Sequence, residues 1–77
     1  RIPVAALRVV DGKTGVYTLD GNVVHFKETK VLYEDEGMYI CEMPMLDGRP
    51  TVLKGQLSLY DAVVVSGRNL YEGKILN

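Results

Sequence analysis

The segment from Leu59 to Leu76 constrains the fold of this chain more than any other stretch. At its centre, Ala62 to Val65 is a run of four apolar residues, three of them β-branched. A polar turn precedes this run, and turns at Gly67 and Gly73 follow it. A short apolar run bounded by turn residues predicts a strand that is buried on both faces. The segment therefore indicates the closing part of a small β-barrel.

Turn residues punctuate the whole chain at short intervals. Eight glycines and three prolines divide the 77 residues into short segments, none of which shows the pattern of an amphipathic helix of ten residues. This spacing is typical of all-β structure. We expect one domain, residues 1–77, folded as a small barrel of six or seven short, mostly antiparallel strands. The expected strands are residues 2–10, 16–19, 22–33, 38–43, 51–53, 62–66 and 74–76, while residues 55–60 fit either a strand or a single helical turn.

Asp20-Gly21 gives the best hairpin signal. Extended apolar residues lie on both sides of it, and Asp-Gly favours the positive φ angles of a two-residue type I′ turn. In the second arm Val24 and Phe26 share one face, whereas Val31 has the opposite parity. A bulge or bend near Lys27-Glu28 would produce this change of face, and a sheet that curls into a barrel needs such bends.

The predicted core draws on the apolar positions of these strands. Cys41, the single cysteine, lies in an apolar stretch and is interpreted as a small buried side chain, since one cysteine cannot form an internal disulfide. The five tyrosines either lie half in the core with solvated hydroxyls, which we favour, or form a stacking platform for a ligand. The core is expected to contain Val16, Leu19, Phe26, Val31, Ile40, Val63, Val64 and Val65.

The charge pattern excludes one class of partner. Nine basic residues are scattered between Arg1 and Lys74, and the net charge is −1. A nucleic-acid-binding surface requires clustered Lys and Arg, so we expect no nucleic-acid partner. The densest charge run is acidic, Glu34-Asp35-Glu36. We interpret this run as a solvated turn, and a metal site is the alternative.

The signatures of enzymes and metal sites are missing from the sequence. Gly12-Lys13-Thr14 ends like a phosphate-binding loop, but Leu7 stands where that motif needs glycine. His25, the single histidine, would need Ser58 or Ser66 and a carboxylate to form a hydrolytic triad, and the spacing does not bring them together. One His and one Cys are too few for a zinc site. We therefore expect no enzymatic activity, no catalytic residue, no metal and no cofactor.

The order of motifs along the chain resembles a known family. An Ile2-Pro3-Val4-Ala5-Ala6-Leu7 opening is followed by Gly15-Val16-Tyr17-Thr18-Leu19, then by a turn and strand from Leu59 to Gly67, and last by Leu70-Tyr71-Glu72-Gly73-Lys74-Ile75. The set is similar to the C-terminal, membrane-proximal β-barrel domain of HlyD-like membrane fusion proteins, the periplasmic adaptor subunits of efflux and secretion systems. The resemblance spans nearly the whole chain.

The chain departs from the family pattern at a few positions. The family's last strand is preceded by Gly-Asp, and Tyr60 stands here in place of that glycine, before Asp61. Glu72 stands where the family commonly has Asp. The loop from Pro44 to Gln56 is longer than in the family. These departures suggest a divergent branch, such as one from a Gram-positive organism.

The resemblance implies a non-catalytic role. Such adaptors sit outside the cytoplasmic membrane, assemble into rings and connect an inner-membrane transporter to an exit duct. The expected partners are thus a transporter and other copies of the adaptor. The expected location is extracytoplasmic, either periplasmic or on the outer face of the membrane of a Gram-positive cell.

We also expect the chain, which begins at Arg1 without Met, to be a fragment of a longer, membrane-anchored protein. The family's barrel usually recruits a strand from the N-terminal part of its parent chain. A missing strand would leave one sheet edge unpaired, and an unpaired edge would allow the fragment to self-associate.

Contacts of a docking domain belong on its exposed loops. The candidate contact residues are Glu34, Asp35, Glu36, Arg49, Arg68 and Asn69. Two alternatives stay open: an independent small β-barrel that binds a small ligand or peptide through its tyrosines, and a non-catalytic appendage of an enzyme. The flanking sequence would separate them, because an adaptor carries a lipoyl-like motif pair and a coiled-coil hairpin, whereas the appendage follows a catalytic domain.

Overall fold

The computed structural model describes residues 1–76 and is all-β, as predicted, apart from one 3-10 turn. The described residues form nine strands rather than six or seven. The predicted strands 2–10 and 22–33 each split in two, and the long loop after β6 contains a hairpin of its own. The strands predicted at 51–53 and 74–76 are wrong: residues 51–53 form no strand, and Ile75 forms only an isolated bridge. The elements are β1 (Ile2–Pro3), η1 (Val4–Ala6), β2 (Arg8–Val10), β3 (Lys13–Asp20), β4 (Val23–Glu28), β5 (Lys30–Asp35), β6 (Met38–Glu42), β7 (Met45–Leu46), β8 (Arg49–Pro50) and β9 (Ala62–Val63).

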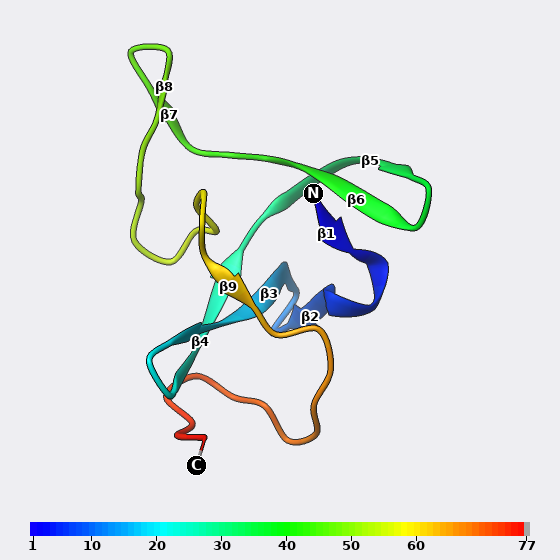
Figure 1. The fold of residues 1–77 in the computed structure, drawn as a ribbon, viewed down its shortest axis with the longest axis vertical. Coiled ribbons are helices and arrows are strands. Elements are labelled where there is room, and N and C mark those ends of the chain that lie inside the picture. The colour runs from blue at the N-terminus through cyan, green and yellow to red at the C-terminus, as the bar shows by residue number, and fades with distance from the viewer. Residues whose placement is uncertain (77) are drawn as a thin grey trace.

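Three antiparallel sheets carry the fold (Figure 1). The first has the order β2-β3-β4, with β9 paired to β3 beyond the end of β2. The second has the order β1-β6-β5, and the third is the β7-β8 hairpin. Two isolated bridges, Val23 with Ile75 and Glu28 with Gln56, tie later segments to β4. Within residues 1–76 these pairings do not by themselves join the sheets into one closed barrel.

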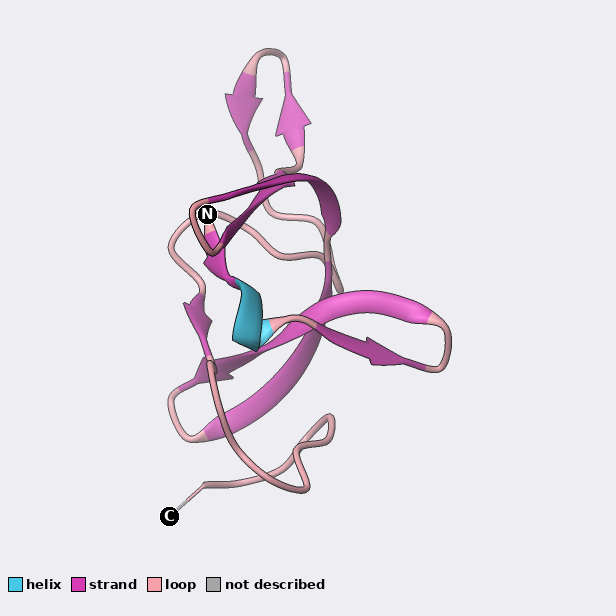
Figure 2. Cartoon of the chain, turned by 90° about the vertical axis from the view of Figure 1, so that its right-hand side faces the viewer, coloured by secondary structure: helices cyan, strands magenta, loops and turns pink. Residues whose placement is uncertain are grey.

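The chain passes from the first sheet to the second through one bent, nearly continuous strand. Only Thr29 separates β4 from β5, and its N–H donates to the carbonyl of Thr14 at 3.1 Å. Figure 2 shows the curve of this long segment. The bend predicted near Lys27-Glu28 thus lies one residue later. The pairing of β5 with β6 also shifts between Val31 and Tyr33.

Two-residue turns close all four hairpins. Asp11-Gly12, Glu36-Gly37 and Asp47-Gly48 have positive φ at both positions, which is the type I′ pattern. The β3-β4 turn differs from the prediction. Asp20 pairs with Val23, so Gly21-Asn22 forms the loop, and only Gly21 has a positive φ, +62°. Glycine at the first loop position fits a type II′ turn.

The core lies where β1, η1 and β3 meet the segment after β8. Ile2, Ala6, Val16 and Leu57 form its buried cluster, and Val24 in β4 is fully buried on the opposite face of the β3-β4 pair from Val16. Of the eight predicted core residues, Val16 is the one that is fully buried. Leu19, Phe26, Val31, Ile40, Val63 and Val64 are half-buried, and Val65 is exposed.

The strand predicted at Ala62 to Val65 is therefore not buried on both faces. Strand β9 contains only Ala62 and Val63, and among the described strands it pairs with β3 alone. Val64 adds one hydrogen bond, from its N–H to the carbonyl of Tyr17 at 2.8 Å. With β3 on one side only, nothing in residues 1–76 covers the far face of Val65, which is 42% exposed.

Candidate docking surface

The largest concentration of exposed apolar side chains lies between β7 and β9. Twelve large hydrophobic residues of the described chain are exposed, and six of them fall within residues 45–60. We call these six the apolar strip. Their exposed fractions run from 46% to 95%. The strip consists of Met45, Leu46, Val52, Leu53, Leu59 and Tyr60.

The β7-β8 hairpin forms the outer end of the strip and projects from the rest of the molecule (Figure 1). Met45 pairs with Pro50, and Leu46 pairs with Arg49. Cross-strand partners point to the same face, so one face carries Met45 with Pro50 and the other carries Leu46 with Arg49. All four residues are exposed. The hairpin therefore presents an apolar side chain on each face.

Buried residues at both ends hold the first part of this segment, residues 45–56, in place. Pro44 is buried before β7, and its carbonyl accepts a hydrogen bond from the N–H of Thr51 at 3.0 Å. At the other end Leu57 is only 2% exposed, and its N–H donates to the carbonyl of Glu28 at 2.8 Å. Residues 45–56 are thus a loop fixed at its two bases, and Leu59 and Tyr60 follow its second base.

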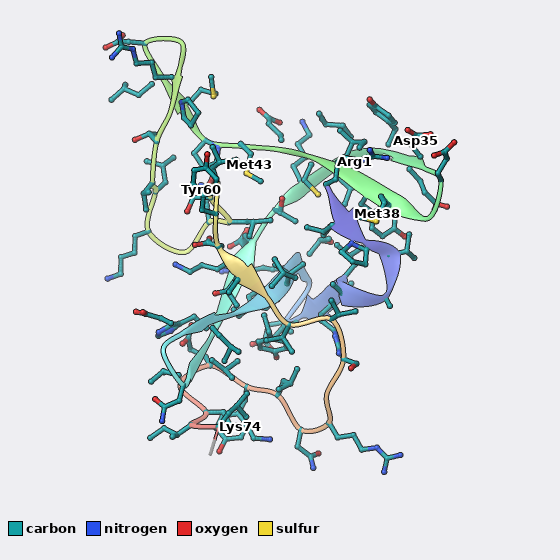
Figure 3. The ribbon with its side chains drawn as sticks, viewed as in Figure 1. Arg1, Asp35, Met38, Met43, Tyr60 and Lys74 are labelled. Atoms are coloured by element: carbon teal, nitrogen blue, oxygen red, sulfur yellow. The ribbon has the colours of Figure 1, made fainter. Side chains whose placement is uncertain are left out.

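Tyr60 is the most exposed residue of the strip and has an unusual backbone. Its φ is +72°, in the left-handed region that favours glycine. Two neighbours hold the turn: the N–H and the hydroxyl of Ser58 donate to Asp61 Oδ2 at 2.9 and 3.2 Å, and the N–H of Asp61 donates to the carbonyl of Ser58 at 3.2 Å. Tyr60, labelled in Figure 3, is 95% exposed as a whole residue.

The predicted contact residues are all exposed, but they do not form one surface. Glu34 and Asp35 end β5 and only Glu36 belongs to the following turn, so most of the run predicted to be a turn is strand. The side chain of Asp35 pairs with Arg1 at 3.5 Å. Arg49 lies in β8, next to the strip.

Arg68 and Asn69 lie in the loop that follows β9, at the other end of the molecule from the β7-β8 hairpin (Figure 1). Their carbonyls accept hydrogen bonds from Lys74 Nζ at 3.2 and 3.0 Å. This contact shapes the loop and leaves the two side chains exposed. Of the six predicted contacts, the structure therefore brings only Arg49 to the apolar strip.

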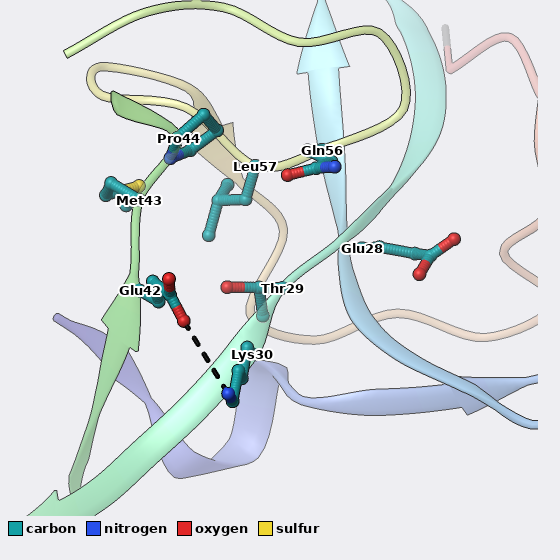
Figure 4. Close-up of a pocket in the computed structure, with 8 residues that line it drawn as sticks. All are labelled: Glu28, Thr29, Lys30, Glu42, Met43, Pro44, Gln56 and Leu57. Carbon is teal, nitrogen blue, oxygen red and sulfur yellow. Dashed lines mark ion pairs between the residues drawn. The ribbon is translucent and has the colours of Figure 1, made fainter. Parts of the chain in front are cut away.

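Two cavities flank β4. One, of about 300 Å³, lies between the start of β5 and the segment before β7, with Leu57 and Pro44 on its wall (Figure 4). Thr29 Oγ1 in its wall is buried without a hydrogen-bond partner, and Lys30 and Glu42 form an ion pair across it at 3.9 Å. The other, of about 570 Å³, lies beside His25. Charged side chains of both signs line both cavities.

His25 pairs with a carboxylate that the sequence did not indicate. Its Nδ1 lies 2.5 Å from Glu72 Oε2, while Glu72 Oε1 accepts the N–H of Phe26 at 3.2 Å. The hydroxyl of Ser58 bonds to Asp61 instead, so the structure does not assemble the triad considered above. Among residues 1–76 no three His, Cys, Asp or Glu side chains are grouped to hold a metal ion.

The Glu72 carboxyl serves a structural purpose on the outer edge of β4. The N–H of Gly73 donates to the Val24 carbonyl, and the Val24 N–H donates to the Lys74 carbonyl, both at 2.7 Å. Glu72 continues this ladder by accepting the next free N–H of the edge. Burial raises the pKa of Glu72, but hydrogen bonds from His25, Phe26 and Gly73, with the charge of His25, lower it by more, so the pKa lies below its ordinary value.

Tyr60 and the exposed hairpin were not identified from the sequence. Two signals were present. Met-Leu-Asp-Gly-Arg, residues 45–49, has the Asp-Gly hairpin pattern flanked by apolar residues. Tyr60 also occupies a position where the similar family has glycine.

Comparisons of the chain with protein-family models, with curated proteins and with solved structures returned no match. In the part of the chain that the structure describes, no helix has the length and apolar character needed to cross a membrane.

Proposed function

We propose that this chain is a non-catalytic docking and assembly domain of an extracytoplasmic adaptor, a membrane fusion protein of the HlyD-like kind, that couples a cytoplasmic-membrane transporter to efflux or secretion. The observation that carries the proposal is the backbone at Tyr60. Its φ of +72° is the conformation of a glycine. The family pattern has a glycine at that position, immediately before the Asp and the valine strand.

The second turn of the resemblance supports the same alignment. The family's exit motif begins Leu-x-Asp-Gly. Gly73 stands at the position of that glycine, and its φ is +87°. The N–H of Lys74 donates to the Tyr71 carbonyl at 3.1 Å, which makes residues 71–74 a β-turn with glycine in its third position. At residues 60 and 73, positions with a positive φ thus coincide with glycines of the family pattern.

The surface of the domain suits a docking role. Half of the large exposed hydrophobic residues lie on the apolar strip, and large exposed apolar patches mark sites of protein or membrane contact. The proposed partners are the transporter and other copies of the adaptor. Val9, 69% exposed on β2, lies on a strand that pairs only with β3 among the described strands, so the free edge of β2 is one place where contact between copies could form.

Deletion of residues 1–77 from the parent protein tests the proposal. We expect the shortened adaptor to remain in the membrane but to lose co-purification with the transporter and to lose export. A parent protein that binds the transporter and exports normally without these residues would contradict the docking role.

A ligand-binding module is the second candidate, favoured by the cavity of about 570 Å³ that Tyr60, His25 and Glu72 help to line. Ligand sites have volumes of about 300–1,000 Å³ but are mostly apolar, whereas Lys27, Lys54 and three carboxylates line this one. Shifts of the His25 and Tyr60 resonances on titration with a small sugar or peptide would favour this candidate over docking.

A further inference from the structure

We infer that the apolar strip, with Tyr60 as its anchor, is the surface through which this domain docks, and that its partner is a protein that offers an apolar groove bordered by carboxylates. The inference rests on the proposed function and deepens it by naming the contact surface and the chemistry of the partner. Three observations carry it: the backbone and exposure of Tyr60, the two-faced hairpin, and the distribution of charge.

The Ser58–Asp61 hydrogen bonds hold the turn at Tyr60, but they do not explain why tyrosine rather than glycine occupies it. A side chain at a φ of +72° costs folding free energy that glycine would avoid. Burial of the ring could offset this cost, but the residue is 95% exposed. Tyrosine therefore makes the isolated domain less stable than glycine would. A contact made outside the domain accounts for the residue, and tyrosine is among the side chains that contribute most to protein interfaces.

The β7-β8 hairpin indicates the shape of the partner. Leu46 projects from one face and Met45 from the other, and both are more than half exposed. A flat partner would cover only one of these faces, whereas a groove covers both. The hairpin can enter a groove because its own strands pair with each other at Met45–Pro50 and Leu46–Arg49. The inward-facing backbone groups of the hairpin keep their hydrogen bonds to each other in such a groove, whereas its outward-facing groups need hydrogen-bond partners on the groove walls.

Charge indicates what borders the groove. On residues 45–60, Arg49 and Lys54 outnumber the free carboxylate of Asp47, although the chain as a whole has a net charge of −1. Asp61, next to the strip, is engaged by Ser58. Neither Arg49 nor Lys54 forms an ion pair within residues 1–76. Carboxylates on the partner would complement these two cations and orient the hairpin.

The same features favour a protein over a lipid surface. Attraction to anionic lipids typically requires clusters of four to eight Lys and Arg, and the strip has two cations with an acid, Asp47, at the tip of its hairpin. Tyr, Met and Arg are the residue types enriched in protein interfaces. The strip contains all three, in Tyr60, Met45 and the adjacent Arg49.

The variant Tyr60→Gly tests the inference, because its expected effects on folding stability and on binding affinity have opposite signs. Because glycine relieves the backbone, this variant should melt at a temperature equal to or higher than that of the wild type. Because the anchor is gone, the affinity of the full-length adaptor for its detergent-solubilised transporter should fall at least tenfold. A residue with a merely structural role could not change stability and affinity in opposite directions. The matched control is Tyr33→Ala, an exposed tyrosine on β5 outside the strip, which should leave the affinity unchanged.

Leu46→Ser and Val52→Ser extend the test along the strip, and each should weaken transporter binding severalfold without changing the fold. If all three strip variants bind like the wild type while deletion of residues 1–77 abolishes binding, the surface is wrong and the docking role stands. If the deletion also has no effect, the proposed function fails. Binding of the wild type to protein-free anionic vesicles that Tyr60→Gly abolishes would replace the protein groove by a lipid surface and overturn the inference.

Discussion

The β3-β4 and β7-β8 hairpins have similar turns but differ in how far their strand residues are buried. Each has a two-residue turn with glycine. In the first, Val16, Tyr17 and Val24 are buried, and the Tyr17 and Phe26 rings pack edge to face with centroids 5.5 Å apart. In the second, all four strand residues are exposed. By their register, Val16 lies on one face of the β3-β4 pair and Tyr17 and Val24 lie on the other, so this hairpin is buried on both faces. Turn chemistry makes a hairpin, but burial of its faces decides whether the hairpin belongs to the core.

The two hairpins also differ at their edges. The β3-β4 pair is covered on both sides, by β2 and β9 on β3 and by two later segments on β4. These segments reach β4 through Lys74 at its start and Gly55 at its end. For β7-β8, by contrast, no further strand of the described chain pairs with either edge. We infer that the first hairpin is the scaffold of the domain and the second is its contact element.

The largest effect that would sharpen this comparison is expected at Gly15 in β3. A Cβ there would lie 2.2 Å from the Lys27 carbonyl oxygen and 2.8 Å from the Phe26 ring. The β4 backbone at Lys27 cannot move away from such a Cβ without a large cost in free energy, so Gly15→Ala should destabilise the domain by about 3 kcal/mol or more. Chemical denaturation would measure this loss.

The matched control is Gly48→Ala in the β7-β8 turn. Nothing lies within 4 Å of a Cβ at Gly48, and only its φ of +75° opposes the change. We expect this variant to lose about 1 kcal/mol. Equal losses at the two glycines would mean that β3 and β4 do not approach each other as closely as the structure shows.

Truncation of one apolar side chain in each hairpin gives the next largest contrast. Val16 is fully buried, so Val16→Ala removes packed methyl groups and should cost about 2 kcal/mol. Leu46 is 65% exposed, and Leu46→Ala should change stability by less than about 0.5 kcal/mol. Urea unfolding of both variants provides the comparison. A large loss at Leu46 would show that the β7-β8 hairpin packs on the core and is not free for a partner.

The turns could be predicted from the sequence because they depend on local residues. Gly12, Gly21, Gly37 and Gly48 all lie in hairpin turns, and each stands next to a polar or acidic residue. Even so, the register of one turn was wrong by a residue. The choice between Asp20-Gly21 and Gly21-Asn22 depends on which residues pair across the strands, and that pairing is set by tertiary contacts.

The core could not be predicted in the same way. The apolar run at Ala62 to Val65 indicates burial, but burial also requires a neighbour on each side, and β9 has one. Conversely, Leu57 lies outside the named strands and is nevertheless buried, because its N–H bonds to Glu28 and its side chain meets Ile2 and Val16. Contacts between segments far apart in the chain leave no local pattern.

For the candidate site, the sequence indicated the loop that carries part of the apolar strip and one neighbouring cation. Arg49 follows from its place in the loop Pro44 to Gln56. Tyr60 does not, because an isolated tyrosine is normally interpreted as a half-buried aromatic residue. Its left-handed backbone and full exposure become visible only when the Ser58–Asp61 turn is formed.

Tyr60→Gly should raise the stability of the domain moderately, whereas the variants above lower it. This difference would sharpen the contrast between the scaffold hairpin and the contact element. Relief of the strained φ, partly offset by the greater freedom of glycine in the unfolded chain, should stabilise the domain by about 0.5–1 kcal/mol. For a domain of this size, that gain raises the melting temperature by roughly 2–8 °C. Tyr60→Ala keeps the strain and should show no such gain. A melting temperature that falls with glycine would indicate that the Tyr60 ring packs on the domain.

The smallest effect is expected at Glu72, which covers the outer edge of β4 and so helps to make that hairpin the scaffold. Its pKa in the folded state lies below the ordinary value of 4.5, through His25 and the N–H groups of Phe26 and Gly73. The carboxylate therefore contributes stability that is fully present above pH 4.5 and is lost as the pH falls through the lowered pKa. Glu72→Gln should remove this part of the acid sensitivity, whereas Glu34→Gln, at an exposed acid on β5, should preserve it. Thermal melts between about pH 6 and pH 3 would test both variants. Identical acid profiles for the wild type and Glu72→Gln would mean that the C-terminal segment stays on β4 through its backbone hydrogen bonds alone.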